Sequence, residues 1–304
     1  MRRRIRLGGQ PPPFVVYGGL ALGVSAVSSA AVIIRLADAP SLTIAAYRLA
    51  LAAIVVVPLG LAFEWGALWS LTRRQWGLVL AAAVCLAAHF AFWIASLEHT
   101  SVASSVVIVT SNPVMVAIGA SLFLRERSSP RVLAGIAVAV AGVVVIAVGD
   151  WDLGDRRLFG DFLAFLGAVA VAGYYIAGRS LRERLSILGY IAPVYGAAAV
   201  ILVAAALATG SRLTGFDVEV YGWLMLLALL PQLVGHSSLN WSLGYLPATL
   251  VATAVMAEPV GASLLAWAVL DEAPPVASVA GGALVLVGVF TTLTGGRARL
   301  KAET

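Results

Sequence analysis

The sequence predicts an all-α membrane protein whose ten transmembrane helices form two inverted five-helix repeats around a central cavity. First, 61% of the 304 residues are hydrophobic and only 12% are charged. In a soluble domain about 45–50% of the residues are hydrophobic and about 25% are charged. Second, apolar runs of roughly 18–25 residues, long enough to cross a bilayer, recur along the chain. Third, the second half repeats landmarks of the first half in the same order.

Each of the ten apolar runs is expected to form one membrane-spanning helix. Short linkers between the runs hold Pro, Gly and nearly all the charge, as linkers at membrane surfaces do. The first run follows a basic N-terminal stretch, but it is too long for the core of a signal peptide and no clear Ala-x-Ala site follows it, so we expect a retained helix. The expected helices are 14–34, 41–63, 75–97, 102–124, 131–149, 159–179, 187–208, 220–243, 248–270 and 276–294.

The distribution of Lys and Arg between alternate loops predicts that both termini are cytoplasmic. With the N-terminus inside, fifteen Lys and Arg fall in cytoplasmic loops and ends, and four fall outside: Arg35, Arg156, Arg157 and Arg212. This asymmetry is the positive-inside pattern, and a missed helix would destroy it. The net charge of +5 is thereby explained by membrane orientation. We therefore expect no nucleic-acid partner.

An offset of 146 residues relates the two halves. It connects Asn112-Pro113-Val114 to Glu258-Pro259-Val260, and it gives five identities, at Pro113, Val114, Glu126, Gly135 and Gly142. Each repeat therefore contains five helices, at 14–149 and 159–295. Since five is odd, the second copy enters the membrane in the opposite orientation. The charges of the corresponding loops agree with this inversion, because Arg residues flank Glu126 whereas Asp271 precedes Glu272.

This organisation resembles the EamA-type branch of the drug/metabolite transporter superfamily over nearly the whole chain. The elements that carry the resemblance are Pro40 followed by Arg48, the first-copy series Pro113, Glu126, Gly135 and Gly142, and the second-copy series Glu258, Pro259, Val260, Glu272, Gly281 and Gly288. One departure is that family members often have Gly before the loop glutamate, where this chain has Arg125 and Asp271.

The resemblance implies a secondary active transporter that moves a small metabolite by alternating access. The substrate is expected to be an amino acid or related compound, and the expected direction is efflux across a bacterial inner membrane. The first, third, fourth, sixth, eighth and ninth helices would line the cavity. The partners are the substrate and the lipid bilayer, with a proton as one option for the coupling ion. We expect a monomer or weak homodimer, no cofactor and no enzymatic activity.

Glu258 is the most informative candidate for substrate or proton binding. It lies near the middle of an expected helix, where a charged group costs about 2.5–3.5 kcal/mol on insertion scales. Such a carboxyl must be neutral, paired or in contact with water. Binding of a proton or of a substrate ammonium fits all three conditions. A buried carboxyl that only holds helices together is the alternative.

Pro113 and Pro259 are expected to kink their helices at equivalent places. Each lacks an N–H and frees the carbonyl four residues earlier, at Val109 and Val255. Freed carbonyls are tolerated where they face a cavity. Asn112, the first-copy counterpart of Glu258, is a further candidate for the site.

Further candidates are polar or aromatic residues at helical spacing. Gln232, His236 and Asn240 share one face of the eighth expected helix, and His89 and Trp93 are spaced likewise on the third. These stripes should face the interior, either to contact substrate or to hold helices together. Arg48, in the second helix, is interpreted as structural, with an interior partner. The weak candidates Tyr174 and Tyr175 lie on the sixth helix.

Three other functions remain as alternatives. A non-transporting scaffold or receptor has the same composition. A membrane haem protein is conceivable because His89 and His236 occupy nearly equivalent places in the two halves. An intramembrane hydrolase lacks support, because neither Gly-x-Ser-x-Gly nor His-Glu-x-x-His occurs. The single cysteine, Cys85, provides no disulfide framework and no metal site based on cysteines.

Overall fold

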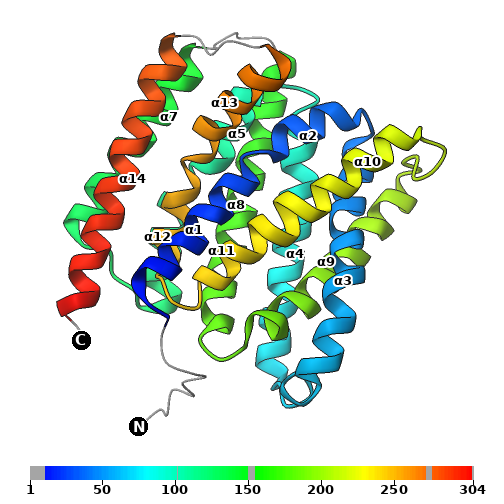
Figure 1. Ribbon diagram of the computed structural model, residues 1–304, viewed down its shortest axis with the longest axis horizontal. Helices are drawn as coiled ribbons and strands as arrows, with labels where there is room; N and C mark the ends of the chain where they lie inside the picture. The colour runs from blue at the N-terminus through cyan, green and yellow to red at the C-terminus, as the bar shows by residue number, and fades with distance from the viewer. Residues whose placement is uncertain (1–10, 101, 150–154, 272–275, 303–304) are drawn as a thin grey trace.

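The protein is a bundle of long apolar helices (Figure 1). The computed structural model describes residues 11–100, 102–149, 155–271 and 276–302, and these contain helices and no strand. Eight described helices are long and apolar enough to cross a membrane, and two shorter apolar helices, Pro130–Val145 and Val279–Gly295, occupy the places of the fifth and tenth expected crossings. The all-helical membrane fold is confirmed, while the count of ten crossings stays a prediction.

The helices follow the expected order, and several expected helices are divided. In chain order the elements are α1 (Pro13–Val27), α2 (Ala30–Ala37), α3 (Ser41–Trp69), α4 (Arg73–Ser96), α5 (Val102–Thr110), α6 (Pro113–Gly119), η1 (Ala120–Leu124), α7 (Pro130–Gly149), α8 (Asp155–Arg182), α9 (Ile187–Ala208), α10 (Val218–Leu227), η2 (Ala228–His236), α11 (Ser237–Ser242), α12 (Ala248–Val255), α13 (Glu258–Leu270) and α14 (Val276–Ala302). The elements η1 and η2 are π-helical.

The surface and the interior have the polarity that a lipid solvent requires. Large apolar side chains cover the outside, such as Phe63 and Phe290, which are 74% and 68% exposed. Polar side chains such as Arg48 and Gln232 are fully buried among the helices. In water this arrangement would be unstable, whereas lipid solvates the apolar side chains.

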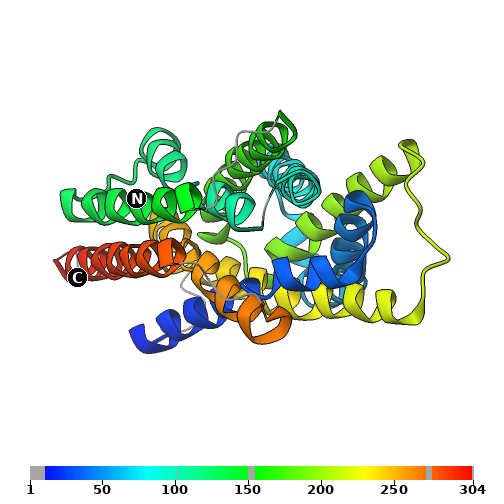
Figure 2. The same cartoon turned by 90° about the horizontal axis from the view of Figure 1, so that it is seen from above.

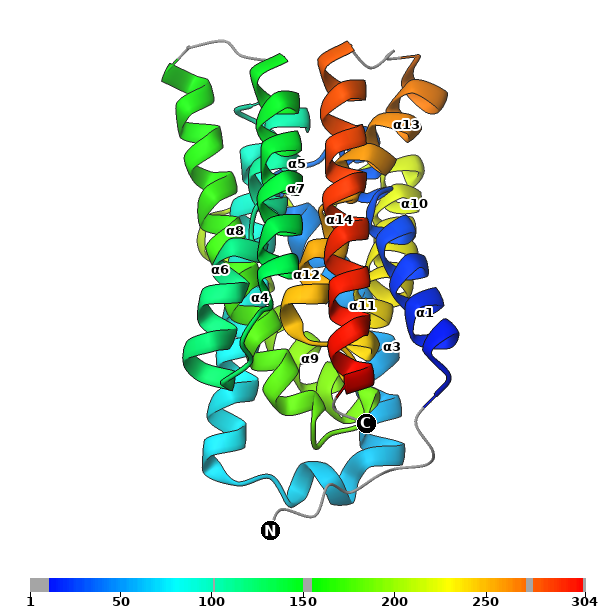
Figure 3. The same ribbon diagram turned by 90° about the vertical axis from the view of Figure 1, so that its left-hand side faces the viewer.

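The helices of the two halves pack in pairs. The contacts join α3 to α9, α4 to α8, α7 to α14, and α1 to the continuous run of η2 and α11. Figure 1 shows α7 beside α14 at one side of the bundle and α3 beside α9 at the other, and Figure 2 shows the same neighbours from above. In Figure 3, α1 begins and α14 ends at the same end of the bundle. We call this end the terminal end.

The glycines that mark the repeat lie where α7 and α14 approach most closely. A Cβ atom added to Gly142 would lie 2.5 Å from the carbonyl oxygen of Gly281, and one on Gly288 would lie 2.5 Å from that of Gly135. No side chain fits in such a space. Small residues let the two backbones touch, which is how membrane helices gain packing energy where the hydrophobic effect is absent.

One helix break was absent from the sequence interpretation. The first expected helix, 14–34, is divided into α1 and α2 at Ser28 and Ser29, although no proline is near. Both hydroxyls donate to carbonyls of the preceding turn, from Ser28 Oγ to Val24 O at 2.9 Å and from Ser29 Oγ to Ala26 O at 2.8 Å. Such bonds compete with the helix ladder and weaken it locally. Conversely, Pro58 and Pro193 lie inside α3 and α9 without dividing them.

Candidate functional site

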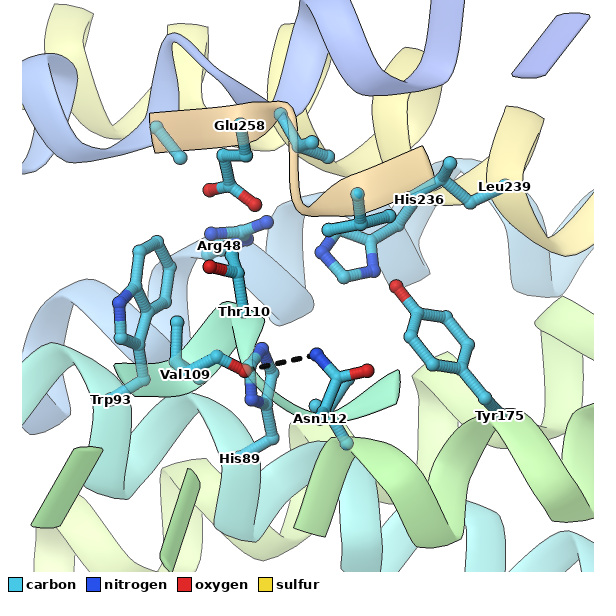
Figure 4. Close-up of a pocket in the computed structure, with 14 residues that line it drawn as sticks. Arg48, His89, Trp93, Val109, Thr110, Asn112, Tyr175, His236, Leu239 and Glu258 are labelled. Atoms are coloured by element: carbon cyan, nitrogen blue, oxygen red, sulfur yellow. Dashed lines mark hydrogen bonds between the residues drawn. The ribbon is translucent and has the colours of Figure 1, made fainter. Parts of the chain in front are cut away.

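Three helix breaks meet around one cavity in the middle of the bundle. They lie between α1 and α2, between α5 and α6, and between α12 and α13. The cavity encloses about 20 Å³, which is close to the space that one water molecule needs. Figure 4 shows its lining: Val27, Ala30, Arg48, His89, Trp93, Val109, Thr110, Asn112, Val171, Tyr175, His236, Leu239, Val255 and Glu258.

In the first half, the break is stabilised by a side-chain donor. Pro113 begins α6 and has no N–H for the carbonyl of Val109. The amide Nδ2 of Asn112 donates to that carbonyl at 2.9 Å. The Oδ1 atom of Asn112 is buried and has no hydrogen-bond partner in the described chain. This acceptor therefore remains available to the cavity.

In the second half, Glu258 takes the place of Asn112. It begins α13 directly before Pro259, and it is only 7% exposed. Figure 4 shows its carboxylate pointing into the cavity towards the guanidinium of Arg48. An ionised carboxylate only accepts hydrogen bonds, so it does not substitute for the Asn112 amide as a donor. Hence the two halves present different chemistry at corresponding positions.

Arg48 supplies the positive charge of the cavity. Its side chain is fully buried, and Nε donates to Gln232 Oε1 at 2.9 Å. The guanidinium carbon lies 4.0 Å from the centre of the Phe90 ring. Within the described chain, Nη1 and Nη2 have no hydrogen-bond partner. The sequence interpretation treated Arg48 as structural, and the structure places it in the wall of the cavity.

Aromatic and imidazole rings form the wall beside Arg48. The rings of His89 and Trp93 stack with centroids 5.8 Å apart and an interplanar angle of 6°. His89 Nδ1 lies 3.0 Å from the carbonyl oxygen of Gly167, so this nitrogen carries the proton and donates. In the described chain, Trp93 Nε1 and His236 Nδ1 are buried without a partner. The wall therefore combines an apolar surface with unsatisfied polar atoms.

Three of the sequence candidates lie outside the lining. Gln232 lies behind Arg48 and orients it through the bond to Nε. Asn240 Nδ2 donates to the hydroxyls of Tyr174 and Tyr195, at 2.6 and 3.1 Å, which connects α11 to α8 and α9. We therefore place Gln232, Asn240 and Tyr174 in the support of the site. The lining residues Thr110 and Val27 were missed, although Thr110 lies within three residues of the proline that the sequence marks.

Polar contacts close the bundle at the terminal end. Arg179 of α8 pairs with Glu126 at 2.7 Å, and its Nη1 donates to the carbonyl of Leu243 at 2.9 Å. Arg182 donates through Nε to the carbonyl of Asn240 at 3.1 Å and through Nη1 to that of Leu185. These bonds connect the loop after η1 with the ends of α8 and α11, and so they join the two halves.

Further contacts close the opposite end. The hydroxyls of Thr43 and Tyr47 donate to the backbone carbonyls of Arg212 and Leu213 at 2.7 and 2.8 Å. The backbone N–H of Ser41 donates to Glu98 at 3.0 Å. These bonds join α3 to the loop after α9 and to the turn after α4.

Comparison with protein families identifies the chain. The model described as the EamA-like transporter family matches residues 14–148 and again residues 158–294. The chain belongs to the EamA-like transporter family. The resemblance predicted from the sequence is thereby confirmed. In this EamA-like chain, residues of both matched segments line the cavity described above.

Several curated proteins are similar to this EamA-like chain. An uncharacterized transporter of Archaeoglobus fulgidus is 24% identical over 67% of this chain and 71% of its own length. A probable terminal-alkyne amino-acid exporter of Streptantibioticus cattleyicolor is 28% identical over 63% of this chain and 64% of its own length. A solved structure, titled only as the crystal structure of a protein, has a TM-score of 0.74 at 19% identity, covering 93% of this chain and 98% of that one. At that identity the likeness shows the fold alone.

The described residues do not form a site suited to a metal ion or a haem. Among them no group of three or more His, Cys, Asp and Glu side chains is arranged to hold a metal ion. The rings of His89 and His236 lie 6.4 Å apart, but a cavity of about 20 Å³ has no room for a haem macrocycle. The lining suits a small polar ligand better than a prosthetic group.

Proposed function

We propose that this EamA-like protein is a secondary active transporter that moves a small metabolite, an amino acid or related compound, out of the cell by alternating access. The observation that carries the proposal is a cavity in the middle of the bundle that is lined by both Arg48 and Glu258, which are buried side chains. Charged groups at such depth are expensive in a scaffold and useful in a transport pathway. The printed name of the similar Streptantibioticus protein supports the substrate class.

The two matched segments are proposed to be inverted repeats of five crossings each, at 14–149 and 159–295. The helix pairing supports this proposal. When each helix is replaced by its counterpart in the other half, the pairs α3–α9 and α7–α14 are each converted into themselves. The pair α4–α8 is converted into the pair that α1 forms with η2 and α11. A two-fold axis in the membrane plane produces this pattern. With ten crossings both termini would lie on the same side of the membrane, and the Lys and Arg distribution supports the cytoplasmic side of an inner membrane.

The cavity must enlarge for a substrate to enter, because about 20 Å³ accommodates only a water molecule. Helix breaks are natural points for such movement, since the ladder of backbone bonds is already interrupted there. Opening towards the cytoplasm requires separation of Glu126 from Arg179. Opening to the other side requires release of the backbone of Arg212 and Leu213 from Thr43 and Tyr47.

Glu258 is proposed to bind a proton or the substrate ammonium in turn as the halves move. Its position in the cavity wall supports either role. Both roles need an ionisable group, and the corresponding residue of the first half, Asn112, has none. The breaks themselves need only a polar residue, so the carboxylate is free to serve transport.

Flux through the purified protein tests the proposal. The full chain is reconstituted in liposomes, and uptake of labelled amino acids is measured under a substrate gradient and under an imposed pH gradient. Saturable uptake above that of protein-free liposomes is the expected result. A folded protein that moves no amino acid or amino-acid derivative would contradict the proposal and favour a scaffold or receptor.

A further inference from the structure

The cavity contains a positive group with unused hydrogen-bonding capacity. Arg48 has one of its five N–H donors on Gln232, and its flat face rests on Phe90. The remaining nitrogens, Nη1 and Nη2, are buried and unpartnered in the described chain. Figure 4 shows the guanidinium within the cavity. Buried polar groups are almost always satisfied, so an unpartnered guanidinium at the wall of a cavity indicates a missing ligand.

The shape of the free group defines what that ligand presents. A guanidinium directs parallel N–H groups at two oxygens of one planar anion, which a carboxylate supplies. A further donor of the cavity wall, Nε1 of Trp93, is also buried without a partner in the described chain. Three unsatisfied donor atoms in the cavity wall favour an anionic group of the ligand there.

A negative group faces the same space. The carboxylate of Glu258 points towards Arg48 across the cavity (Figure 4), yet Arg48 Nη1 and Nη2 form no hydrogen bond to it. The two side chains are therefore not consumed by a closed ion pair. An ammonium on the ligand would complete the hydrogen bonding of the carboxylate.

The balance of charge discriminates between classes of ligand. Arg48 and Glu258 together are neutral. An anion without an amine would satisfy Arg48 and place like charge near Glu258, and a cation without a carboxylate would do the opposite. A zwitterion satisfies both groups and adds no net charge to a region that lipid surrounds. The apolar remainder of the ligand would contact Trp93, Tyr175 and Leu239, which also line the cavity.

We infer that the cavity recognises the zwitterionic head of an α-amino acid, with Arg48 binding the carboxylate and Glu258 binding the ammonium. This inference rests on the proposed transport function and deepens it. It gives Arg48 a substrate-binding role in addition to its packing on Phe90. Gln232 acts as a positioning residue, because its bond to Nε fixes the plane of the guanidinium.

Competition among matched ligands tests the inference. Uptake of labelled L-phenylalanine by proteoliposomes of the full chain is competed with unlabelled L-phenylalanine, with its amide, which has no carboxylate, and with its N-acetyl derivative, which has no ammonium. A parallel series uses L-leucine. Binding in detergent is measured separately by ligand-induced thermal stabilisation. We expect both blocked derivatives to bind about tenfold or more weakly than the zwitterion, because each loses a charge-assisted contact.

Variants assign the two ends of the ligand. Arg48→Gln is expected to weaken zwitterion binding about tenfold or more and to abolish the preference for acid over amide, while the preference for amine over N-acetyl remains. Glu258→Gln is expected to give the converse pattern. Arg48→Lys retains the charge without the planar fork, and so it covers the case in which Arg48→Gln fails to fold. Arg184→Gln, which removes an exposed guanidinium just after α8, is the charge-matched control.

The possible outcomes separate the two proposals. Two results overturn the inference alone. The first is transport by the wild type with equal affinity for the acid and the amide. The second is an unchanged preference for the acid over the amide in both Arg48→Lys and Arg48→Gln. Binding with the expected pattern but without flux overturns the transport proposal alone. A folded protein that neither binds nor moves any amino acid or amino-acid derivative overturns both.

Discussion

The side-chain amide of Asn112 donates a 2.9 Å hydrogen bond to the carbonyl oxygen of Val109, the carbonyl that Pro113 leaves without a backbone donor. Glu258 stands at the corresponding place beside Pro259. The first break is therefore stabilised by its own asparagine, and the second carries an ionisable group towards Arg48. This difference underlies the first two predictions.

Asn112→Ala should destabilise the protein, because the carbonyl of Val109 loses its side-chain donor. We expect the free energy of unfolding to fall by about 1–2 kcal/mol, measured by denaturation in detergent. Ser111→Ala is the matched control. Its hydroxyl bonds to the carbonyl of Ile108, which also receives the backbone N–H of Ser111. Equal stability of the two variants would contradict the proposed role of Asn112.

Glu258→Gln should fold normally and lose transport driven by a pH gradient if the carboxylate carries the coupling proton. The amide keeps the size and polarity of the side chain but does not titrate. If Glu258 binds only the substrate ammonium, affinity for the substrate falls and the coupling remains. The checks are pH-driven and substrate-driven uptake in proteoliposomes, with Asp217→Asn, an exposed residue before α10, as control. Transport equal to wild type from acidic to mildly alkaline pH would make the carboxylate structural.

Glu126→Gln should favour the state that is open towards the terminal end. The Arg179–Glu126 pair joins the halves there, and its side chains are 16% and 22% exposed, so solvent screens it only in part. We expect a shift in the conformational equilibrium of about 0.5–1 kcal/mol. A cysteine placed at Thr110, in a Cys85→Ala background, should react about two- to fivefold faster with a reagent applied from the terminal side. Thr214→Ala, in an exposed loop at the opposite end, is the control, and equal reactivity in both variants would exclude a gating role for the pair.

Gly142→Ala and Gly288→Ala should each disrupt the packing of α7 against α14. An added Cβ would lie 2.5 Å from the opposing carbonyl oxygen in either case. Overpacking of this kind costs about 1–3 kcal/mol. Gly66→Ala and Gly77→Ala are the matched controls, because a Cβ at either position meets no atom within 4 Å. Thermal unfolding in detergent checks the difference, and equal unfolding temperatures in all four variants would show that α7 and α14 separate without cost.

Labelling of single cysteines should place the two ends of the bundle on opposite sides of the membrane. Asp152, a natural choice for the outer loop, lies outside the described residues, and Arg182 is buried and bonded to backbone carbonyls. The exposed positions Thr214 and Arg184 are better sites. In intact cells an impermeant reagent should label Thr214→Cys only, and Arg184→Cys should react after permeabilisation. Labelling of both in intact cells would refute the predicted orientation.

Much of the fold was determined by the sequence alone. In lipid the backbone satisfies its hydrogen bonds either within a helix or within a closed barrel, and apolar runs of about 20 residues are too long for barrel strands. The runs therefore predict helices. The repeat of Gly135 and Gly142 at Gly281 and Gly288 marked the contact of α7 with α14. The structure shows that an added Cβ at Gly135, Gly142 or Gly288 would collide with the opposing helix. Pro113 and Pro259 likewise identified two of the three breaks, because a missing N–H is a local property of the residue.

The tertiary structure decided which polar residues surround the cavity. Gln232, His236 and Asn240 share a helix face in the sequence, yet one orients Arg48, one lines the cavity and one binds two tyrosine hydroxyls. The break at Ser28 and Ser29 also had no sequence signal, because serine is common within membrane helices. Its effect arises where α13 comes so close that a Cβ on Gly261 would lie 2.5 Å from Ser28 Oγ. Sequence periodicity fixes the direction of a side chain only relative to the axis of its own helix. A binding site depends on how neighbouring helices are rotated about their axes and where those axes cross.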